Sequence, residues 1–395
     1  MYKRIIILIC LIVGVSLVSF GMLYNHKSEQ KVTIQFASWG SESEIRILKP
    51  LLKDFERENP DIKVDFLHIP QNYFQKIHLL FASNTAPDIV FLNNQYLPIY
   101  ANAGVLENLN QYKNEFEFDK FYSKSIDSMT WNGKIYAVPR DVSNLVVFYN
   151  KDLFKKYGVQ LPTKSWNFEE FLNIAGKITR NGVFGVSFEE EPLFYLPYLT
   201  SNGGWTKYDT LHYFDKNILD SEKNKFGLNF YADLRRKYHV SPKREDIGSA
   251  TMAQLFLQQK LGMYVSGRWM VPKFREDAKF DWNVVEFPKG SAGSIVPLDS
   301  SGWAIAKSSK NKTQAVRLIK YLSSTKSLTK FTESGLIVPA RKDVAQSKVF
   351  LDDQKPENAK VFIDIISTSI PTPVTLNYRE ILDDLKIKNE YLFNQ

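Results

Sequence analysis

Aromatic and polar side chains follow several predicted strands at the point where each strand ends. They are Trp39, Asn93, Arg140, Asp141 and Trp269, together with Gly302 and Trp303 at the edge of another strand. In open α/β sheets the ligand crevice lies outside the carboxyl ends of the strands. Aromatic rings cover the C–H faces of sugars, and carboxylate, amide and guanidinium groups bind sugar hydroxyls. The pattern therefore predicts a carbohydrate-type site built from strand ends.

The stretch KLGMYVSGRWM, residues 260–270, places a tryptophan at such a strand end. Leu261, Met263 and Val265 alternate as in a buried β-strand, and Ser-Gly-Arg-Trp follows at once. Trp269 is therefore either a flat platform for a ligand or a core residue. The strand-end position suggests the platform, but both interpretations stay open on this stretch alone.

The sequence lacks the usual motifs of metal binding, nucleotide binding and serine-hydrolase chemistry. The five histidines form neither an HExxH pair nor a zinc-like cluster, and the single cysteine, Cys10, lies in the N-terminal apolar run. The sequence has no GxxxxGK[ST], no GxGxxG after a strand and no GxSxG elbow. We therefore expect no metal, no cofactor and no catalytic residue.

Glycoside hydrolysis is an alternative that motifs do not dismiss, because it needs only two carboxylates that flank a bond, at no fixed spacing. The acidic run Glu189–Glu191 is a place where one of them could lie. A solvated acidic loop is the competing interpretation of this run. An exported glycosidase therefore remains a second hypothesis.

Length and charge narrow the class of protein. The 395 residues are enough for two domains, and a hydrophobic content of 44% indicates globular cores. The net charge of +8 is spread over scattered basic residues, and pairs such as Lys155-Lys156 sit beside acidic or apolar residues. We expect solvated basic faces and no nucleic-acid partner.

The first 30 residues predict export. Lys3 and Arg4 precede an uncharged apolar run, Ile5–Tyr24. This pattern fits either a signal peptide or an uncleaved membrane anchor, with the rest of the chain beyond the membrane. We expect a location in the periplasm or on the outer face of the cytoplasmic membrane.

From Lys31 onward, strand and helix patterns alternate. Strands are predicted at 32–38, 62–69 and 88–92, and helices at 44–58, 73–82 and 97–103. Pro50, inside the first of these helices, predicts a kink or a fresh start. Such alternation is typical of a parallel sheet covered by helices, so the predicted fold class is α/β.

A second set of elements follows residue 139. Its helices are predicted at 151–157, 168–178 and 225–237, and its strands at 262–266 and 282–287. After the Gly/Ser-rich stretch 290–294, a strand at 302–307 and a helix at 313–323 look like the first set again. The simplest architecture is two α/β lobes between which the chain crosses more than once.

A series of phrases in a fixed order carries a resemblance to a known family. They are VTIQFASWGSESE, LLKDFERENPDIKVDF, FASNTAPDIVFLNN, ANAGVLENL, WNGKIYAVPRD, VVFYNKDLFKKYGVQLPTKSWNFEEF, SNGGW, MYVSGRWM and SGLIVPARKDV. From Lys31 to Ile381 the chain resembles the family-one extracellular solute-binding proteins of sugar-importing ABC transporters, a group that includes maltose- and trehalose-binding proteins. The resemblance implies a two-lobed periplasmic-binding-protein fold of type II with the ligand between the lobes. It also implies a monomeric, non-enzymatic protein that delivers sugar to permease subunits.

The resemblance implies ligand contacts at particular positions. They are Glu42, Ser43, Asn93, Asp141, Trp269, Gly302, Trp303 and Arg341. Trp39 and Arg140 join the predicted site because of their strand-end positions. Leu92 and Gln95 stand near places where maltose binders carry an aromatic and an acidic residue, which argues against a maltodextrin-like ligand. We expect a small neutral glycoside, a disaccharide or a glycosylglycerol, with a membrane-anchored sugar sensor as a further alternative.

Both lobes are expected to be discontinuous in sequence. The N-terminal lobe is predicted to comprise residues 31–140 and 291–345, and the C-terminal lobe residues 141–290 and 346–395. The strand and helix pattern that resumes after 290–294 motivates these boundaries. Closure around a ligand is expected to bend the chain near 138–141 and 287–290.

Overall fold

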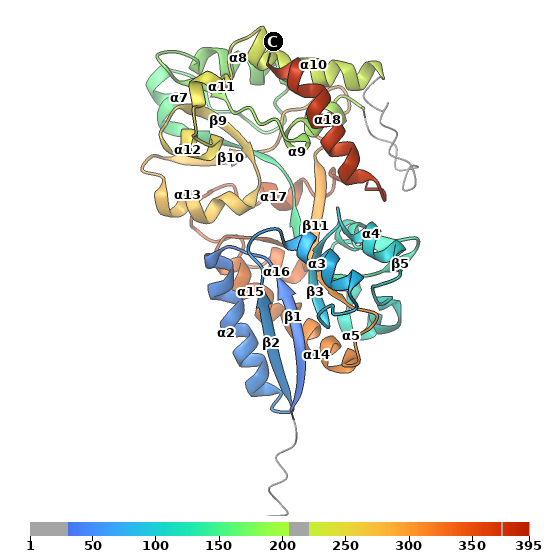
Figure 1. Cartoon of the computed structure of the whole chain (residues 1–395). Helices are drawn as coiled ribbons and strands as arrows, with labels where there is room; N and C mark the ends of the chain where they lie inside the picture. The colour runs from blue at the N-terminus through green and yellow to red at the C-terminus, as the bar shows by residue number, and fades with distance from the viewer. Residues whose placement is uncertain (1–30, 205–220, 373, 395) are drawn as a thin grey trace, which may run out of the picture.

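A computed structural model describes residues 31–204, 221–372 and 374–394. The predicted leader, residues 1–30, lies outside the described residues. Figure 1 shows two lobes, one above the other, each with its own β-sheet and with helices packed against it. The predicted two-lobed α/β fold is confirmed.

The lower lobe in Figure 1 holds a mixed sheet. Its strands are β1 (Val32–Ser38), β2 (Ile62–His68), β3 (Ile89–Asn93), β6 (Val138–Ser143), β11 (Pro297–Ile305) and β12 (Val338–Pro339), with β13 (Ile370–Pro371) paired to β11. They lie in the order β12-β6-β11-β3-β1-β2. β1 is parallel to β2 and β3, whereas β11 is antiparallel to both β3 and β6. The carboxyl ends of β1, β3 and β6 therefore lie at one edge.

Helices of this lobe pack on the sheet and at its ends. They are α2 (Glu42–Glu58), α3 (Tyr73–Ala82), α4 (Leu97–Asn102), α5 (Lys113–Phe116), α6 (Ser123–Ser128), α14 (Lys312–Leu322), α15 (Thr325–Glu333) and α16 (Lys342–Ala345). α2 follows the N-cap Ser41 and buries residues such as Leu48 and Phe55 on one face. Pro50 lies inside this continuous helix, so the predicted fresh start is wrong; buried residues on both sides of the proline hold α2 together.

The upper lobe has a smaller sheet with the strand order β10-β7-β9-β8. Its strands are β7 (Val146–Asn150), β8 (Phe184–Val186), β9 (Leu261–Ser266) and β10 (Trp282–Val285). β7, β9 and β10 are buried along their whole length, so both faces of the sheet are covered. The helices of this lobe are α7 (Lys151–Tyr157), α8 (Phe168–Ile178), α9 (Pro192–Thr200), α10 (Glu222–Arg236), α11 (Arg244–Ile247), α12 (Met252–Leu257), α13 (Val271–Asp277), α17 (Val361–Asp364) and α18 (Tyr378–Phe393).

One link between the two sheets is very short. Asn144 and Leu145 alone separate β6 from β7, and the side-chain amide of Asn144 donates a hydrogen bond to the carbonyl of Phe362 at 2.9 Å. The hinge predicted at 138–141 lies inside β6, where backbone pairing with β11 and β12 restrains the chain. The link at 144–145 is therefore the better place for a bend, while the domain boundaries stay a prediction.

Candidate functional site

One cavity, with a volume of about 200 Å³, lies between the lobes. The lower lobe contributes the ends of β1 and β6, the first turn of α2, part of β11 and the segment before β12. The upper lobe contributes the short 3-10 helix η5 (Arg268–Met270). The cavity is lined by Trp39, Glu44, Arg140, Asp141, Val142, Ser143, Arg268, Trp269, Ser301, Leu336, Ile337 and Val338. Four of the predicted site residues, Trp39, Arg140, Asp141 and Trp269, thus meet at one place.

A larger hollow, of about 480 Å³, lies on the upper lobe alone. It is lined by residues 158–163 and by side chains on and just before α8. No strand end reaches this hollow, and the lower lobe contributes nothing to it. The inter-lobe cavity is therefore the better candidate, since ligands of open α/β sheets bind beyond the strand ends.

Trp39 forms one wall of the cavity because β1 ends just before it. Its ring packs against Tyr73, Phe74 and Phe91, with centroid separations of 5.0, 5.2 and 4.5 Å. These neighbours come from α3 and β3, so two elements fix the orientation of the ring. The residue stays half-buried, which leaves part of an immobilised aromatic surface open to the cavity.

A buried cluster of one guanidinium and two carboxylates lies beside Trp39. Arg140 forms an ion pair with Glu44 and contacts Asp141 Oδ2 with Nε and Nη2, both at 2.7 Å. The other oxygen of Asp141 accepts a hydrogen bond from the backbone nitrogen of Ser301 at 3.2 Å. The guanidinium carbon also lies 4.4 Å from the ring centroid of Phe91. The cluster is therefore a rigid set of acceptors and donors in the cavity wall.

Burial and charge act in opposite directions within this cluster. Burial by itself would lower the pKa of Arg140, but the charges of Glu44 and Asp141 raise that pKa above its ordinary value. Burial raises the pKa of the Asp141 carboxyl, and the neighbouring Arg140 opposes the rise. Arg140 therefore remains a cation and serves as the counter-ion that both carboxylates share.

Trp269 reaches the cavity from the upper lobe. β9 ends at Ser266, and a Cβ atom at Gly267 would overlap the indole ring of Trp269. Only glycine at 267 therefore lets the ring lie against the backbone in η5. Trp269 is half-buried and lines the cavity, in contrast to a fully enclosed core residue. The platform interpretation of this tryptophan is compatible with that placement and remains a prediction.

The structure places three predicted contact residues away from the cavity. Trp303 is 1% exposed and packs against Phe91, because β11 begins at Pro297 and Trp303 therefore lies in mid-strand between β3 and β6. A Cβ atom at Gly302 would overlap the carbonyl of Val138, so this glycine permits close pairing with β6. Gly302 and Trp303 therefore do not line the cavity, and their roles as ligand contacts stay predictions.

Arg341 is the third such residue. Its Nη2 lies 3.1 Å from Glu117 Oε2, and its Nε lies 3.0 Å from Asp343 Oδ1. The side chain is 6% exposed, and none of the three residues lines the cavity. Arg341 therefore acts within the lower lobe as an ion-pair partner.

Glu42, Ser43 and Asn93 are near the site without lining the cavity. Glu42 and Ser43 are exposed in the first turn of α2, where the hydroxyls of Ser43 and Ser41 hydrogen-bond at 2.7 Å. Asn93 ends β3, and its side-chain oxygen accepts a hydrogen bond from Tyr96 N at 3.2 Å. Their roles as ligand contacts stay predictions.

Glu44 is a cavity residue that the sequence analysis missed. The pattern Ser41-x-x-Glu44 is typical of a capping box, in which the glutamate bonds back to the N-cap backbone. Ser41 does accept a hydrogen bond from Glu44 N at 3.4 Å, but the Glu44 carboxylate contacts Arg140. Its 7% exposure depends on the contact with Arg140 of β6, which is distant in the sequence.

Metal-type clusters and membrane-spanning helices are both absent from the described part of the chain. Within residues 31–204, 221–372 and 374–394, no three histidine, cysteine, aspartate or glutamate side chains form a group that could hold a metal ion. The helices among those residues are too short or too polar to cross a membrane.

Comparisons with known proteins agree with this architecture. The family model described as "Bacterial extracellular solute-binding protein" matches residues 30–328. The multiple sugar-binding protein of Streptococcus mutans is 25% identical over 354 residues, which cover 82% of this chain and 79% of the relative. The galactooligosaccharide-binding protein of Bacillus subtilis is 24% identical over 382 residues, 94% of this chain and 87% of the relative. An ABC substrate-binding protein of Listeria monocytogenes, solved with cycloalternan, superposes with a TM-score of 0.83 at 26% identity and covers 92% of this chain and 94% of its own.

Two lobes, a short link between their sheets and an inter-lobe cavity define the class of two-lobed binding proteins. The chain belongs to the bacterial extracellular solute-binding protein family. The family assignment made from the sequence phrases is confirmed.

Proposed function

We propose that this protein captures a small neutral glycoside, a disaccharide or a glycosylglycerol, between its lobes and delivers it to the permease of an ABC importer. The observation that carries the proposal is the pairing of Trp39 and Trp269, from opposite lobes, at one cavity that also contains buried charged groups. Aromatic faces suit the C–H surfaces of a pyranose, and carboxylates and guanidinium groups suit its hydroxyls. We infer a binding protein with no enzymatic activity, exported to the periplasm or to the outer face of the membrane.

The charges around the cavity support a neutral ligand. Glu44 and Asp141 each contribute one negative charge, and Arg140 and Arg268 each contribute one positive charge, so the four lining charges cancel. An anionic sugar enclosed here would add a net negative charge to a buried site whose lining charges already cancel, which is costly. A neutral sugar leaves the balance intact.

Relatives support the carbohydrate class. The curated relatives from S. mutans and B. subtilis are described as sugar- and galactooligosaccharide-binding proteins, and the Listeria structure contains cycloalternan. Each match spans more than three quarters of both chains, so the likeness concerns the whole two-lobed body. A permease partner follows from the same family membership and is part of the proposal.

The hydrolase alternative finds little support in this cavity. A glycosidase needs one protonated carboxylic acid aimed at the glycosidic oxygen. Here both lining carboxylates contact Arg140, which holds them in the cavity wall. The arrangement is better suited to holding hydroxyls than to donating a proton.

A thermal-shift screen of the exported part of the chain tests the proposal. The panel contains maltose, trehalose, cellobiose, lactose, isomaltose, melibiose and glucosylglycerol, with glucuronate as the anionic counterpart. A ligand that binds only the folded state raises the unfolding temperature by mass action. We expect at least one neutral member to raise Tm without turnover, and glucuronate to have no effect. A panel without any neutral binder, or hydrolysis of a member, contradicts the proposal.

A further inference from the structure

Arg268 occupies an unusual position in the cavity wall. It lies between Gly267 and Trp269, directly beyond the end of β9, and it is the upper lobe's only charged residue among those that line the cavity. Despite this placement, it is 2% exposed. A long cationic side chain is therefore buried at the place where the two lobes meet.

The guanidinium of Arg268 has no built-in acceptor. None of its three nitrogens has a hydrogen-bond partner within the described residues. Its carbon lies 4.0 Å from the ring centroid of Phe350 and 5.5 Å from that of Phe362, so aromatic rings hold it in place without using its N–H groups. Because buried polar groups are normally hydrogen-bonded, these donors require an explanation.

The other buried arginines of the described chain all have hydrogen-bond or ion-pair partners within the protein. Arg140 contacts Glu44 and Asp141, and Arg341 contacts Glu117 and Asp343. The remaining one, Arg235, bonds the carbonyl of Pro242 at 2.9 Å and Glu190 at 3.1 Å. Each has at least one carboxylate partner, which Arg268 lacks.

Neighbouring charges do not supply the missing partner. Asp352 is a nearby carboxylate, but its two oxygens accept hydrogen bonds from Arg275 Nη2 at 3.1 and 3.2 Å. The pKa of Arg268 is lowered to about 9, chiefly by burial; the charge of Arg275 contributes to the lowering, and that of Asp352 opposes it. The site around Arg268 thus favours an acceptor that comes from outside the chain.

We infer that Arg268 is a ligand-binding residue that donates hydrogen bonds to acceptor oxygens of the bound glycoside. The inference rests on the proposed function and deepens it. The lower lobe has carboxylate acceptors at Glu44 and Asp141 in the cavity wall, and the upper lobe has the donors of Arg268, which are enclosed in this structure and turn toward the cavity when the ligand binds. A sugar hydroxyl both donates and accepts, so a pyranoside with adjacent hydroxyls satisfies both sides at once. Arg268 also makes the affinity depend on closure, since its partner oxygen is held against the opposite lobe.

The test compares Arg268→Met, Arg268→Lys and a matched control, Arg244→Gln. Arg244 begins α11 at the outer part of the upper lobe and contacts Glu190 and Glu390, so its substitution removes a positive charge without touching the cavity. Each variant is titrated calorimetrically with the panel sugars, and its unfolding temperature is measured with and without sugar. Lysine at 268 keeps the charge but loses the planar fork of donors.

We expect Arg268→Met to raise Kd at least tenfold and to abolish the sugar-induced rise in Tm. Arg268→Lys should have an intermediate affinity, and Arg244→Gln should bind sugar as tightly as the wild type. Without sugar, Arg268→Met is expected to be at least as stable as the wild type, because it removes a buried cation that has no partner.

Two results overturn the inference: affinity of Arg268→Met within twofold of the wild type, or a lower Tm of that variant without sugar, which identifies a purely structural arginine. If no panel sugar binds the wild type, the proposed function fails first, and the sugar-free Tm still decides whether Arg268 is structural.

Discussion

At the scale of single residues, Trp269 and Trp303 differ in their exposure to the cavity, although each follows a glycine within two residues. Gly267 lets the indole of Trp269 rest on the backbone beyond the end of β9, where it faces the cavity. Gly302 lets β6 approach β11, and the following tryptophan lies inside the sheet at 1% exposure. The distance of a tryptophan from its strand end therefore decides whether it can meet a ligand.

Trp269→Ala is expected to weaken all bound panel sugars together by about tenfold or more, equivalent to roughly 1.4 kcal/mol, because stacking area is shared by pyranosides. Trp303→Ala is the contrasting variant and should destabilise the fold by about 3–5 kcal/mol through loss of core packing. Calorimetric titration and chemical unfolding of both proteins measure the two effects. If Trp269→Ala binds within twofold of the wild type, Trp269 is a core residue.

Asp141→Asn should change the ranking among epimers, whereas the tryptophan variant preserves it. The substitution keeps the shape of the side chain but removes the charge shared with Arg140, and charge-assisted hydrogen bonds contribute about 1.5–3 kcal/mol. We expect at least about tenfold weaker binding of the best sugar. The epimeric pairs cellobiose and lactose, and isomaltose and melibiose, report the ranking.

Asp343→Asn is the matched control, since Asp343 also pairs with a nearby arginine, Arg341, but away from the cavity. Equal loss in the two variants, or an unchanged ranking in Asp141→Asn, contradicts a direct contact between Asp141 and sugar hydroxyls.

At the scale of elements, periodicity in the sequence predicted strands and helices well where one face is apolar. β1 and α3 have the predicted bounds, and β9 begins one residue earlier than predicted. β11 was predicted to begin at Gly302 but begins at Pro297. The prediction missed its first half because Asp299 and Ser300 break the apolar pattern there. These polar residues have partners in the fold: Asn94 donates to Asp299 at 2.8 Å, and the Ser300 nitrogen donates to Asn94 at 3.2 Å.

The sequence also predicted only part of the candidate site. Strand ends were visible in the sequence, and the four predicted residues that line the cavity all follow from that rule or from the family resemblance. Glu44 and Arg268 were missed because their roles depend on what faces them across the fold. Glu44 looks like a capping residue, and Arg268 is notable only once its burial and its lack of an acceptor are known.

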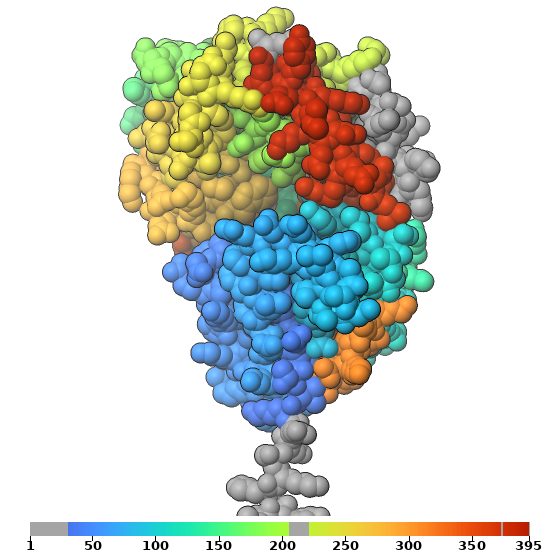
Figure 2. Space-filling view, in the orientation of Figure 1, coloured from blue at the N-terminus to red at the C-terminus, as the bar shows by residue number. Residues whose placement is uncertain are grey.

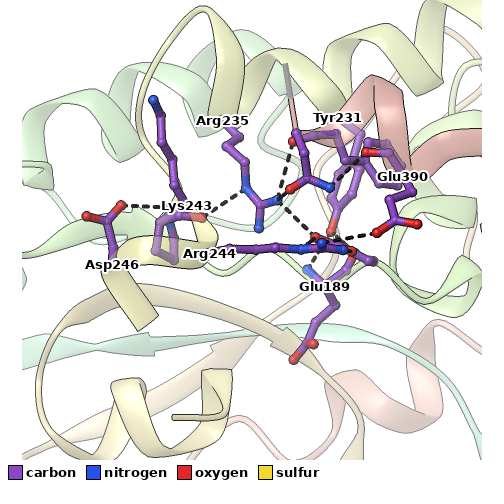
Figure 3. A network of polar contacts seen from close by, with 11 residues as sticks. Glu189, Tyr231, Arg235, Lys243, Arg244, Asp246 and Glu390 are labelled. Atoms are coloured by element: carbon purple, nitrogen blue, oxygen red, sulfur yellow. Dashed lines mark hydrogen bonds and ion pairs between the residues drawn. The ribbon is translucent and has the colours of Figure 1, made fainter. Parts of the chain in front are cut away.

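The last described helix, α18, is fixed on the upper lobe by the polar network in Figure 3. Arg235 Nη1 contacts Glu190 at 3.1 Å and the carbonyl of Phe393 at 3.3 Å. Arg244 contacts both Glu190 and, at 3.1 Å, Glu390 of α18. Glu190, in the acidic run at 189–191, is therefore a structural partner of two arginines. This role explains its position without a catalytic function.

Glu189 in the same run should make stability depend on pH. Its pKa is raised to about 7, chiefly by burial and in addition by the charges of Glu191 and Glu190. Figure 3 shows its side chain directed away from the arginines. Between an ordinary carboxyl pKa and about 7 the native state binds one more proton than the unfolded state, so stability falls as pH rises through this window.

Glu189→Gln should remove that fall. We expect equal stability of variant and wild type at pH 4, and an advantage for the variant on the order of 1 kcal/mol at pH 8, a value reduced for partial solvent exposure. Urea unfolding at pH 4, 6 and 8 measures the difference. Glu333→Gln, at an exposed carboxylate of the lower lobe that is paired with Lys330, is the control. Parallel pH curves for Glu189→Gln and the wild type contradict the prediction.

At the scale of the whole molecule, the site exists only where the two lobes face each other. Figure 2 shows the two lobes in contact along their border. The lower lobe supplies Trp39, Glu44, Arg140 and Asp141, and the upper lobe supplies Arg268 and Trp269. Neither set alone encloses a sugar, so ligand affinity and the relative position of the lobes are coupled.

Sugar binding should therefore draw the lobes together by bending the short link at Asn144 and Leu145. A ligand shifts a conformational equilibrium only by its difference in affinity for the two states, and contacts from Trp269 and Arg268 are gained only when the upper lobe meets a sugar already held by the lower one. Small-angle scattering of the wild type with a saturating panel sugar should show a smaller radius of gyration than without it. Trp269→Ala at the same sugar concentration should show a smaller change, since it loses an upper-lobe contact. An unchanged scattering profile of the wild type at saturation, with binding verified by calorimetry, means that the sugar enters lobes that are already closed.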